Sequence, residues 1–166
     1  FGIALAHNGN LINTDTLRRE VFEQDRRNVN TESDSEVLLN VFAHELDKQR
    51  VLTPDAAFRA VEGVTRRAKG GYAVLALVLG LGLVAFRDPN GIRPLVLGRR
   101  DSDAGTEYAI ASESVALDVL GFERIRDRNR HRHLGRLDDR TLRRVVERAV
   151  VDRRLVAEFL DRKIGH

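Results

Sequence analysis

The apolar side chains of this chain change their spacing once, near residue 70, and this change constrains the fold more than any other feature. Between residues 14 and 68 they recur every three or four positions, which predicts amphipathic helices with one buried face. From residue 72 to residue 111 they gather in short runs bounded by Gly, Pro and Asn, which predicts antiparallel strands. Helices followed by a strand meander predict an α+β fold, with helices layered on antiparallel sheet.

Three helices are expected in the first part of the chain. The first covers residues 13–24, with Phe22 as an additional candidate for its inner face. The second begins at Ser33, because a Ser at the cap followed three residues later by Glu36 has the capping-box form. The third begins at Pro54, since proline is tolerated at the first helical position. The inner faces of the three helices are expected to carry Leu17, Val21, Val37, Leu38, Val41, Phe42, Leu46, Ala57, Val61, Val64 and Ala68.

Turn residues divide the rest of the chain. Strands are expected at residues 1–6, 72–79, 83–87, 95–99 and 107–111, and a short helix at residues 114–120. The first strand is expected to stop at the string HNGN of residues 7–10, because Asn-Gly is a common tight-turn dipeptide. The string DPNG of residues 88–91 predicts a second turn.

Length and composition limit the class of protein. A chain of 166 residues, 42% of them hydrophobic, fits one globular domain. Apolar runs stay well short of the roughly 20 residues of a membrane span, and no secretory leader is visible at Phe1. Without cysteine there is no disulfide framework, so a soluble, cytoplasmic protein is expected. Because methionine is also absent, we expect a segment of a longer protein.

The last 39 residues differ in composition from the rest. From Arg128 to His166 the chain holds twelve Lys or Arg against six Asp or Glu. We therefore divide the chain at residue 127, into a domain of residues 1–127 and a divergent basic tail of residues 128–166 that is expected to be helical in part. The tail interleaves acids and has one aromatic residue, Phe159, which disfavours a nucleic-acid partner.

A few polar residues are candidates for chemistry, each with a structural alternative. The amide of Asn8 beside the N–H of Gly9 can form an oxyanion hole, although the pair alone is more often a simple turn. Asp34 in the first turn of a helix complements the helix dipole with no function required. Asp88 and Arg93 flank a turn and are ordinarily solvated or ion-paired. His7 and the histidines of the tail have no metal-ligand spacing.

Four sequence motifs, taken in order along the chain, connect these candidate residues with one family. They are AHNGNL at residues 6–11, TESDSE at 31–36, AFRDPNGIRPL at 85–95 and ASES at 111–114. Together they resemble the signature series of the class II glutaminase domain, in the form found in the amidophosphoribosyltransferase family. The first two strings are shared with other class II enzymes, whereas the last two resemble the purine-synthesis enzyme specifically. The resemblance covers residues 1–127.

The resemblance implies a fold and roles for single residues. The fold would be that of an N-terminal-nucleophile hydrolase, an αββα sandwich of antiparallel sheets between helical layers, incomplete here at its N-terminus. Asn8 and the N–H of Gly9 would form the oxyanion hole, and Asp34 would hold the α-amino group of the substrate glutamine. Asp88 and Arg93 would hold their turn together. The reaction implied is glutamine hydrolysis that supplies ammonia to phosphoribosyl pyrophosphate, giving 5-phosphoribosylamine for purine synthesis.

The family also uses parts that we do not find in this sequence. Its nucleophile is an N-terminal cysteine, and its phosphoribosyltransferase domain binds magnesium, so this segment alone is expected to be inactive and to bind no metal or cofactor. Expected partners are glutamine and the remainder of the parent enzyme, a homo-oligomer, with no membrane association. Two alternatives remain: a non-catalytic module whose basic tail binds an acidic partner, and another class II glutamine amidotransferase.

Overall fold

The structure, a computed structural model, describes residues 2–103 and 105–125. In chain order its elements are β1 (Ile3–Leu11), α1 (Thr14–Glu23), α2 (Asp34–Asp47), α3 (Pro54–Arg67), β2 (Gly70–Val78), β3 (Gly82–Arg87), β4 (Val96–Ser102), β5 (Gly105–Ala111), α4 (Ser114–Val119) and β6 (Glu123–Arg124). All strand pairs are antiparallel, in two three-stranded sheets ordered β1-β2-β3 and β5-β4-β6. The helical character predicted for the tail from Arg128 lies outside the described residues.

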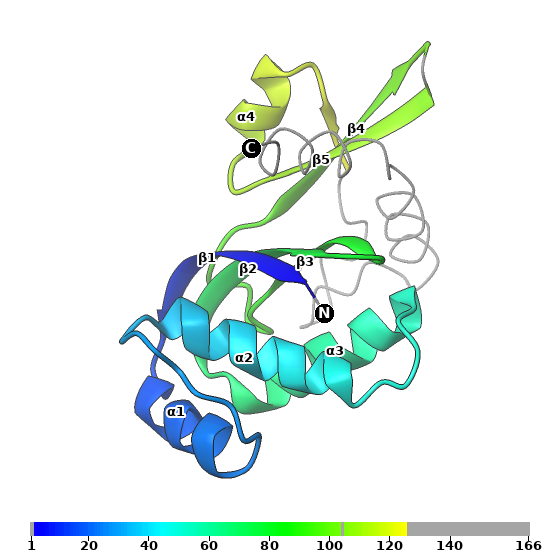
Figure 1. Cartoon of the computed structure of the whole chain (residues 1–166). Helices are drawn as coiled ribbons and strands as arrows, with labels where there is room; N and C mark the ends of the chain where they lie inside the picture. The colour runs from blue at the N-terminus through cyan, green and yellow to red at the C-terminus, as the bar shows by residue number, and fades with distance from the viewer. Residues whose placement is uncertain (1, 104, 126–166) are drawn as a thin grey trace, which may run out of the picture.

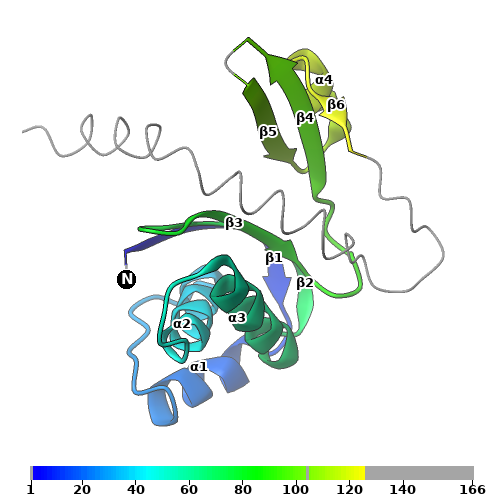
Figure 2. The ribbon, with the colours of Figure 1, turned by 90° about the vertical axis from the view of Figure 1, so that its right-hand side faces the viewer.

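The elements lie in layers. Helices α1, α2 and α3 cover one face of the first sheet, and the second sheet with α4 lies beyond its other face (Figure 1). A view turned by 90° shows the same order of helices, sheet and sheet (Figure 2). This is the α+β arrangement expected from the sequence, with antiparallel sheets between helices as in the N-terminal-nucleophile hydrolase sandwich.

Helical spacing correctly predicted the buried faces of α1, α2 and α3. Of the expected inner-face residues, all are buried except Val61, which is partly buried and packs against the same core. Phe22 is the exception among the candidates, since it is 63% exposed. In the centre of the core Phe42 contacts Phe86 with ring centroids 5.6 Å apart, and Tyr72 meets Phe86 edge-on at 6.4 Å. The core therefore joins α2 to strands β2 and β3.

The helix caps differ in one detail from the expectation. Thr53 Oγ1 accepts a hydrogen bond from the Ala56 N–H (3.2 Å), as a cap ahead of Pro54 should. Ser33 Oγ accepts from the Ser35 N–H (3.2 Å). The reciprocal half of the predicted capping box is wrong: Glu36 reaches back past Ser33 and accepts from the N–H groups of two residues ahead of the cap. These donors are Asn30 (2.8 Å) and Thr31 (2.7 Å).

The predicted turn at residues 7–10 is also wrong. Strand β1 continues through this string to Leu11 and pairs with β2 along its whole length, with Asn8 opposite Ala73 and Gly9 opposite Tyr72. Gly9 has φ +147°, and a Cβ placed there would collide with the carbonyl oxygen of Gly71. The glycine therefore serves the close approach of two strands, and pairing with β2 outweighs the local turn preference of Asn-Gly.

A cluster of charged side chains ties the three helices to each other. Arg67, at the end of α3, lies 2.8 Å from Asp25 Oδ2, 3.4 Å from Glu45 Oε1 and 3.4 Å from Glu20 Oε2. His44 Nε2 lies 3.2 Å from the other oxygen of Asp25. Burial works against the charge of Arg67, but the three nearby carboxylates prevail and raise its pKa above the ordinary value. These ion pairs fix how α1 and α2 sit against α3.

Candidate functional site

Asp34 occupies the start of α2 and is held by strand β1. Its Oδ2 accepts a hydrogen bond from the Leu11 N–H (3.1 Å), and its side chain is 20% exposed. In the first turn of α2 its negative charge is complementary to the helix dipole. Asp34 therefore offers an oriented anionic group that solvent, or a ligand, can reach.

The hydrogen-bond pattern of β1 decides which of its N–H groups are free. The N–H of Leu79 bonds to the carbonyl of Gly2 (2.9 Å), and the N–H of Ile12 bonds to that of Lys69 (2.9 Å). Because bonded and non-bonded pairs alternate in an antiparallel ladder, even-numbered residues of β1 bond to β2 and odd-numbered ones point their N–H groups away from it. The N–H of Gly9 therefore faces the open edge of the sheet, as does that of Leu11.

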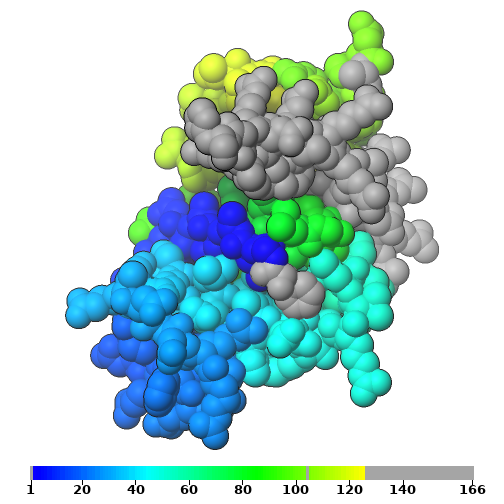
Figure 3. Space-filling model, viewed as in Figure 1, coloured from blue at the N-terminus to red at the C-terminus, as the bar shows by residue number. Residues whose placement is uncertain are grey.

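This edge lies at the surface of the molecule. Strand β1 is the first strand in the order β1-β2-β3, and it appears in dark blue at the surface in Figure 3. Along β1 exposure alternates: Asn8 and Asn10 are exposed, whereas Leu11 is buried in the core. Asn8 therefore lies on the face turned away from the helices. No hydrogen bond joins its side chain to Asp34 within the described residues, so these two predicted site residues are brought near one another through β1 only.

His7 was missed as a site residue by sequence reasoning. Its side chain is 2% exposed, and its Nδ1 lies 3.1 Å from Ser35 Oγ and 3.4 Å from Asp34 Oδ1. The histidine comes directly before Asn8 and thus joins the predicted oxyanion residues to the start of α2. A search for metal-ligand spacing could not find it, since its partners are one carboxylate and one hydroxyl.

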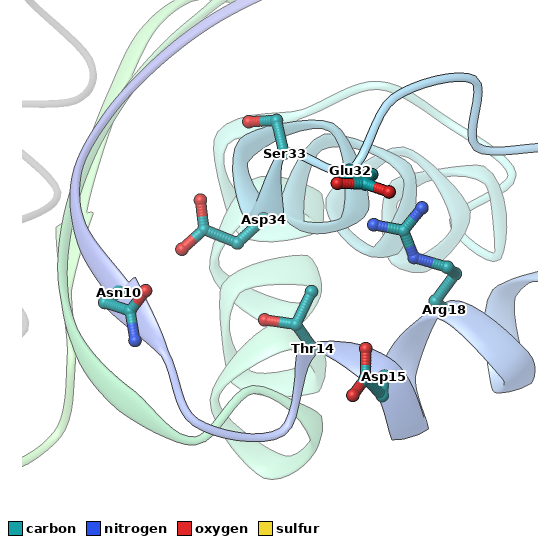
Figure 4. A pocket seen from close by; sticks show the side chains of 7 residues that line it. All are labelled: Asn10, Thr14, Asp15, Arg18, Glu32, Ser33 and Asp34. Carbon is teal, nitrogen blue, oxygen red and sulfur yellow. The ribbon is translucent and has the colours of Figure 1, made fainter.

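An open cavity of about 700 Å³ lies beside Asp34. Its lining residues are Asn10, Thr14, Asp15, Arg18, Glu32, Ser33 and Asp34. Figure 4 shows the Asp34 carboxylate pointing toward the strand that carries Asn10, and the Arg18 guanidinium pointing toward Glu32. Arg18 Nη1 also donates to the carbonyl of Thr31 (2.7 Å). The cavity is polar, and with three carboxylates and one guanidinium it suits a ligand with a cationic group.

Asp88 is buried and organises the loop after β3. It is 2% exposed, and its carboxylate accepts hydrogen bonds from four backbone N–H groups. The donors are Tyr72 (3.3 Å), Asn90 (3.0 Å), Ile92 (3.0 Å) and Arg93 (3.1 Å). Burial tends to raise the pKa of Asp88, but the four donors outweigh it and leave the pKa below the ordinary value. Arg93 takes part through its backbone, since its side chain is exposed.

Two searches of the described residues concern other classes of site. Within residues 2–103 and 105–125, no three His, Cys, Asp or Glu side chains gather closely enough to hold a metal ion. In the same part of the chain, every helix is too short or too polar to cross a membrane.

The comparisons with known proteins place this chain in a family. A family model described as a glutamine amidotransferase domain matches residues 2–119, which is more than half of the chain. The chain therefore belongs to the glutamine amidotransferase family. Asn8, Gly9, Asp34 and Asp88 all lie inside the matched residues.

Individual relatives carry a more particular name. An amidophosphoribosyltransferase of Pseudomonas aeruginosa is 60% identical over 129 residues, covering 76% of this chain and 26% of the relative. One of Escherichia coli is 58% identical over 130 residues, with the same coverage. The solved glutamine phosphoribosylpyrophosphate amidotransferase of B. subtilis, in complex with ADP and GMP, matches with a TM-score of 0.57 and 35% identity, over 75% of this chain and 24% of that one. The chain spans about a quarter of the length of these relatives.

Proposed function

We propose that this chain supplies part of the glutaminase site of an amidophosphoribosyltransferase, namely the oxyanion hole and the anchor for the glutamine α-amino group. The observation that carries the proposal is the edge of β1, where, among the described residues, the N–H of Gly9 has no ladder partner and faces the same side as the carboxylate of Asp34. The 60% identity to a relative named amidophosphoribosyltransferase supports the choice of enzyme.

The spacing along β1 suits glutamine. The N–H groups of Gly9 and Leu11 are two strand residues, or about 7 Å, apart, and Asp34 is bonded to the second of them. The amino nitrogen and side-chain carbonyl oxygen of glutamine are joined by five bonds, so an extended molecule reaches from the carboxylate to the N–H of Gly9. A single substrate thus spans both ends of the proposed site.

Each residue then has one chemical task. When a nucleophile attacks the side-chain amide of glutamine, its carbonyl oxygen gains negative charge, and donors preorganised at that point lower the barrier. The Gly9 N–H and the Asn8 amide are the donors. Asp34 accepts hydrogen bonds from the substrate ammonium group and fixes the distance of the reacting amide from the oxyanion hole. Asp88 and Arg93 hold their loop and do not touch substrate.

The remaining parts of the reaction are assigned to residues outside this chain. The chain contains no cysteine, so the thiol that attacks glutamine is taken from elsewhere in the enzyme, and the isolated chain is expected to be inactive. We also propose that ammonia passes to phosphoribosyl pyrophosphate to form phosphoribosylamine, and that any magnesium binds with that substrate. A cytoplasmic location and homo-oligomeric assembly remain predictions.

A chimaera tests the proposal. Residues 2–119 of this chain would replace the matching segment of the full-length E. coli relative, which supplies the remaining residues. We expect the chimaera to hydrolyse glutamine and to form phosphoribosylamine with either glutamine or ammonia. Activity with ammonia but none with glutamine, in a folded chimaera, would contradict the proposal.

A further inference from the structure

The imidazole of His7 touches the proposed substrate anchor from the inside of the fold. It lies on the helix-facing side of β1, with Nδ1 3.4 Å from Asp34 Oδ1 and 3.1 Å from Ser35 Oγ. Its side chain is 2% exposed, and its Nε2 is buried without a hydrogen-bond partner among the described residues. A side chain that only filled the core would need no polar atom at this place.

The surroundings of the two ring nitrogens assign the proton. A carboxylate can only accept hydrogen bonds, so Asp34 Oδ1 favours a proton on the nitrogen that faces it, Nδ1. A proton on Nε2 would leave a buried N–H without an acceptor, which is costly. The imidazole therefore carries its proton on Nδ1 and donates toward Asp34 and Ser35.

Strand β1 thereby holds both oxygens of one carboxylate. His7 faces Oδ1, and the Leu11 N–H donates to Oδ2. These two residues lie four apart in β1 and enclose Asn8 and Gly9 between them. The same strand that carries the proposed oxyanion donors therefore also fixes the orientation of the Asp34 carboxylate.

We infer that His7 is a positioning residue for glutamine binding, which acts by orienting the Asp34 carboxylate toward the substrate ammonium group. The inference rests on the proposed function and adds a residue to it. Loss of the Nδ1 donor should let the carboxylate rotate, which weakens a charge-assisted hydrogen bond to the substrate. The effect should appear in the KM for glutamine, because the oxyanion donors on Gly9 and Asn8 stay in place.

Three variants of the chimaera separate positioning from packing. His7→Asn keeps an N–H donor at the place of Nδ1, His7→Gln moves the donor to the place of Nε2, and His7→Leu removes it. We expect His7→Leu and His7→Gln to raise the glutamine KM about tenfold or more, with kcat changed less than about threefold. His7→Asn should restore most of the affinity. Activity with ammonia, which bypasses Asp34, should stay unchanged in all three.

The outcomes are distinct. An unaltered chimaera that is active with ammonia but not with glutamine would count against the proposed function itself. An active chimaera in which His7→Leu leaves the glutamine KM unchanged, or in which His7→Asn is as impaired as His7→Leu, would overturn the inference alone. A loss of ammonia-dependent activity in His7→Leu would show a purely structural role and would overturn it as well.

A second measurement needs no enzymatic activity. Long-range ¹H–¹⁵N NMR spectra of the chain itself report which ring nitrogen of His7 carries the proton. We expect the proton on Nδ1, with a changed ¹⁵N shift at Nδ1 in Asp34→Ala. A proton on Nε2, or an Nδ1 ¹⁵N shift that stays the same in Asp34→Ala, would contradict the contact between His7 and Asp34 on which the inference rests.

Discussion

The two sheets of this protein are packed to very different degrees. Around the first sheet, helices α1–α3 bury a continuous core that includes Phe42, Tyr72 and Phe86. After Phe86, Leu117 is the one buried hydrophobic residue in the part of the chain that the structure describes. Helix α4 instead leaves Val115 and Val119 exposed, at 63% and 80%, and Leu120, directly after the helix, is 58% exposed.

The difference shows which half can hold the candidate site in a fixed geometry. A site held to within a fraction of an ångström needs a rigid, well-packed support. Strand β1 and the start of α2 have that support, since both pack on the first core. The second sheet contributes little buried apolar area among the described residues, so the stability of the chain should reside in residues 3–87. The predictions below test that asymmetry.

The largest effect is expected from Phe42→Ala. Phe42 is fully buried and contacts the Phe86 ring, so truncation should lower the free energy of unfolding by about 3–5 kcal/mol. Phe22→Ala is the matched control, because Phe22 is 63% exposed and its loss should change stability by less than about 0.5 kcal/mol. Urea unfolding followed by circular dichroism measures both. Similar losses in the two variants would mean that the core is not where the structure puts it.

The charged clusters of the two halves should also differ. Arg67→Met leaves the buried Asp25 without its arginine partner and leaves Glu45 with Lys48 alone, which should lower the free energy of unfolding by about 3 kcal/mol. In the second sheet, Arg99 pairs with Asp101, and both side chains are at least half exposed. Arg99→Met should leave stability unchanged in the same unfolding measurement, because exposed pairs are screened. A measurable loss of unfolding free energy in Arg99→Met would contradict the expected difference between the charged clusters of the two halves.

Two glycines offer the next comparison. A Cβ at Gly9 meets the backbone of β2, which cannot move without breaking the sheet, so Gly9→Ala should destabilise by about 2–3 kcal/mol. A Cβ at Gly98 in β4 meets Leu117 Cδ2 and Phe122 Cβ at 2.9 Å, which is a less close contact than the collision of a Gly9 Cβ with the Gly71 carbonyl oxygen, and the Leu117 methyl group can move. Gly98→Ala should therefore cost only about 1 kcal/mol. Equal thermal unfolding temperatures for the two variants would argue against the tight pairing of β1 with β2.

The smallest effect concerns acid. The folded-state pKa of Asp88 lies below its ordinary value of 3.8, so the folded protein binds this proton less readily than the unfolded chain. Its stabilisation is complete above that ordinary value and is lost as the pH falls through the lower, folded-state pKa. We expect Asp88→Asn to lower the free energy of unfolding by about 1–2 kcal/mol at pH 7. At acid pH the difference in free energy of unfolding between the variant and the unaltered chain should become smaller. A difference that stays constant from pH 7 to pH 3 would exclude this account.

Sequence patterns predicted α1, α2 and α3 well because each one buries a stripe at helical spacing, and α2 and α3 also begin at a side-chain cap. The same reasoning failed at residues 7–10, where the deciding contact is the pairing with residues 71–74 of β2, more than sixty residues away. Gly70 leaves room for β1 to pass close by, because a Cβ there would meet the carbonyl oxygen of Asn10. The glycine pair at 70 and 71, which lies opposite Leu11 and Asn10, is the signal that could have revealed the strand.

The candidate site also contains residues that local sequence predicts and residues that it does not. Asp34 could be recognised because a carboxylate at a helix start is visible locally and the four strings matched a family. The roles of His7 and Arg67 depend on partners brought together only by packing, such as Ser35 and Asp25. No sequence spacing predicts the role of either residue. Phe22 is the opposite case, because helical spacing made it a candidate for the core and the fold leaves it exposed.

The most direct test of the proposed site is steady-state glutaminase kinetics of the chimaera with Asp34→Ala and with Asn8→Ala. Asp34→Ala should raise the glutamine KM by about a hundredfold with a smaller change in kcat, because it removes a charged hydrogen bond to bound substrate. Asn8→Ala should lower kcat by about a hundredfold with little change in KM, because it removes a donor to the charged transition state. The reverse pattern, or equal effects of both on KM and kcat, would contradict the roles assigned to the two residues.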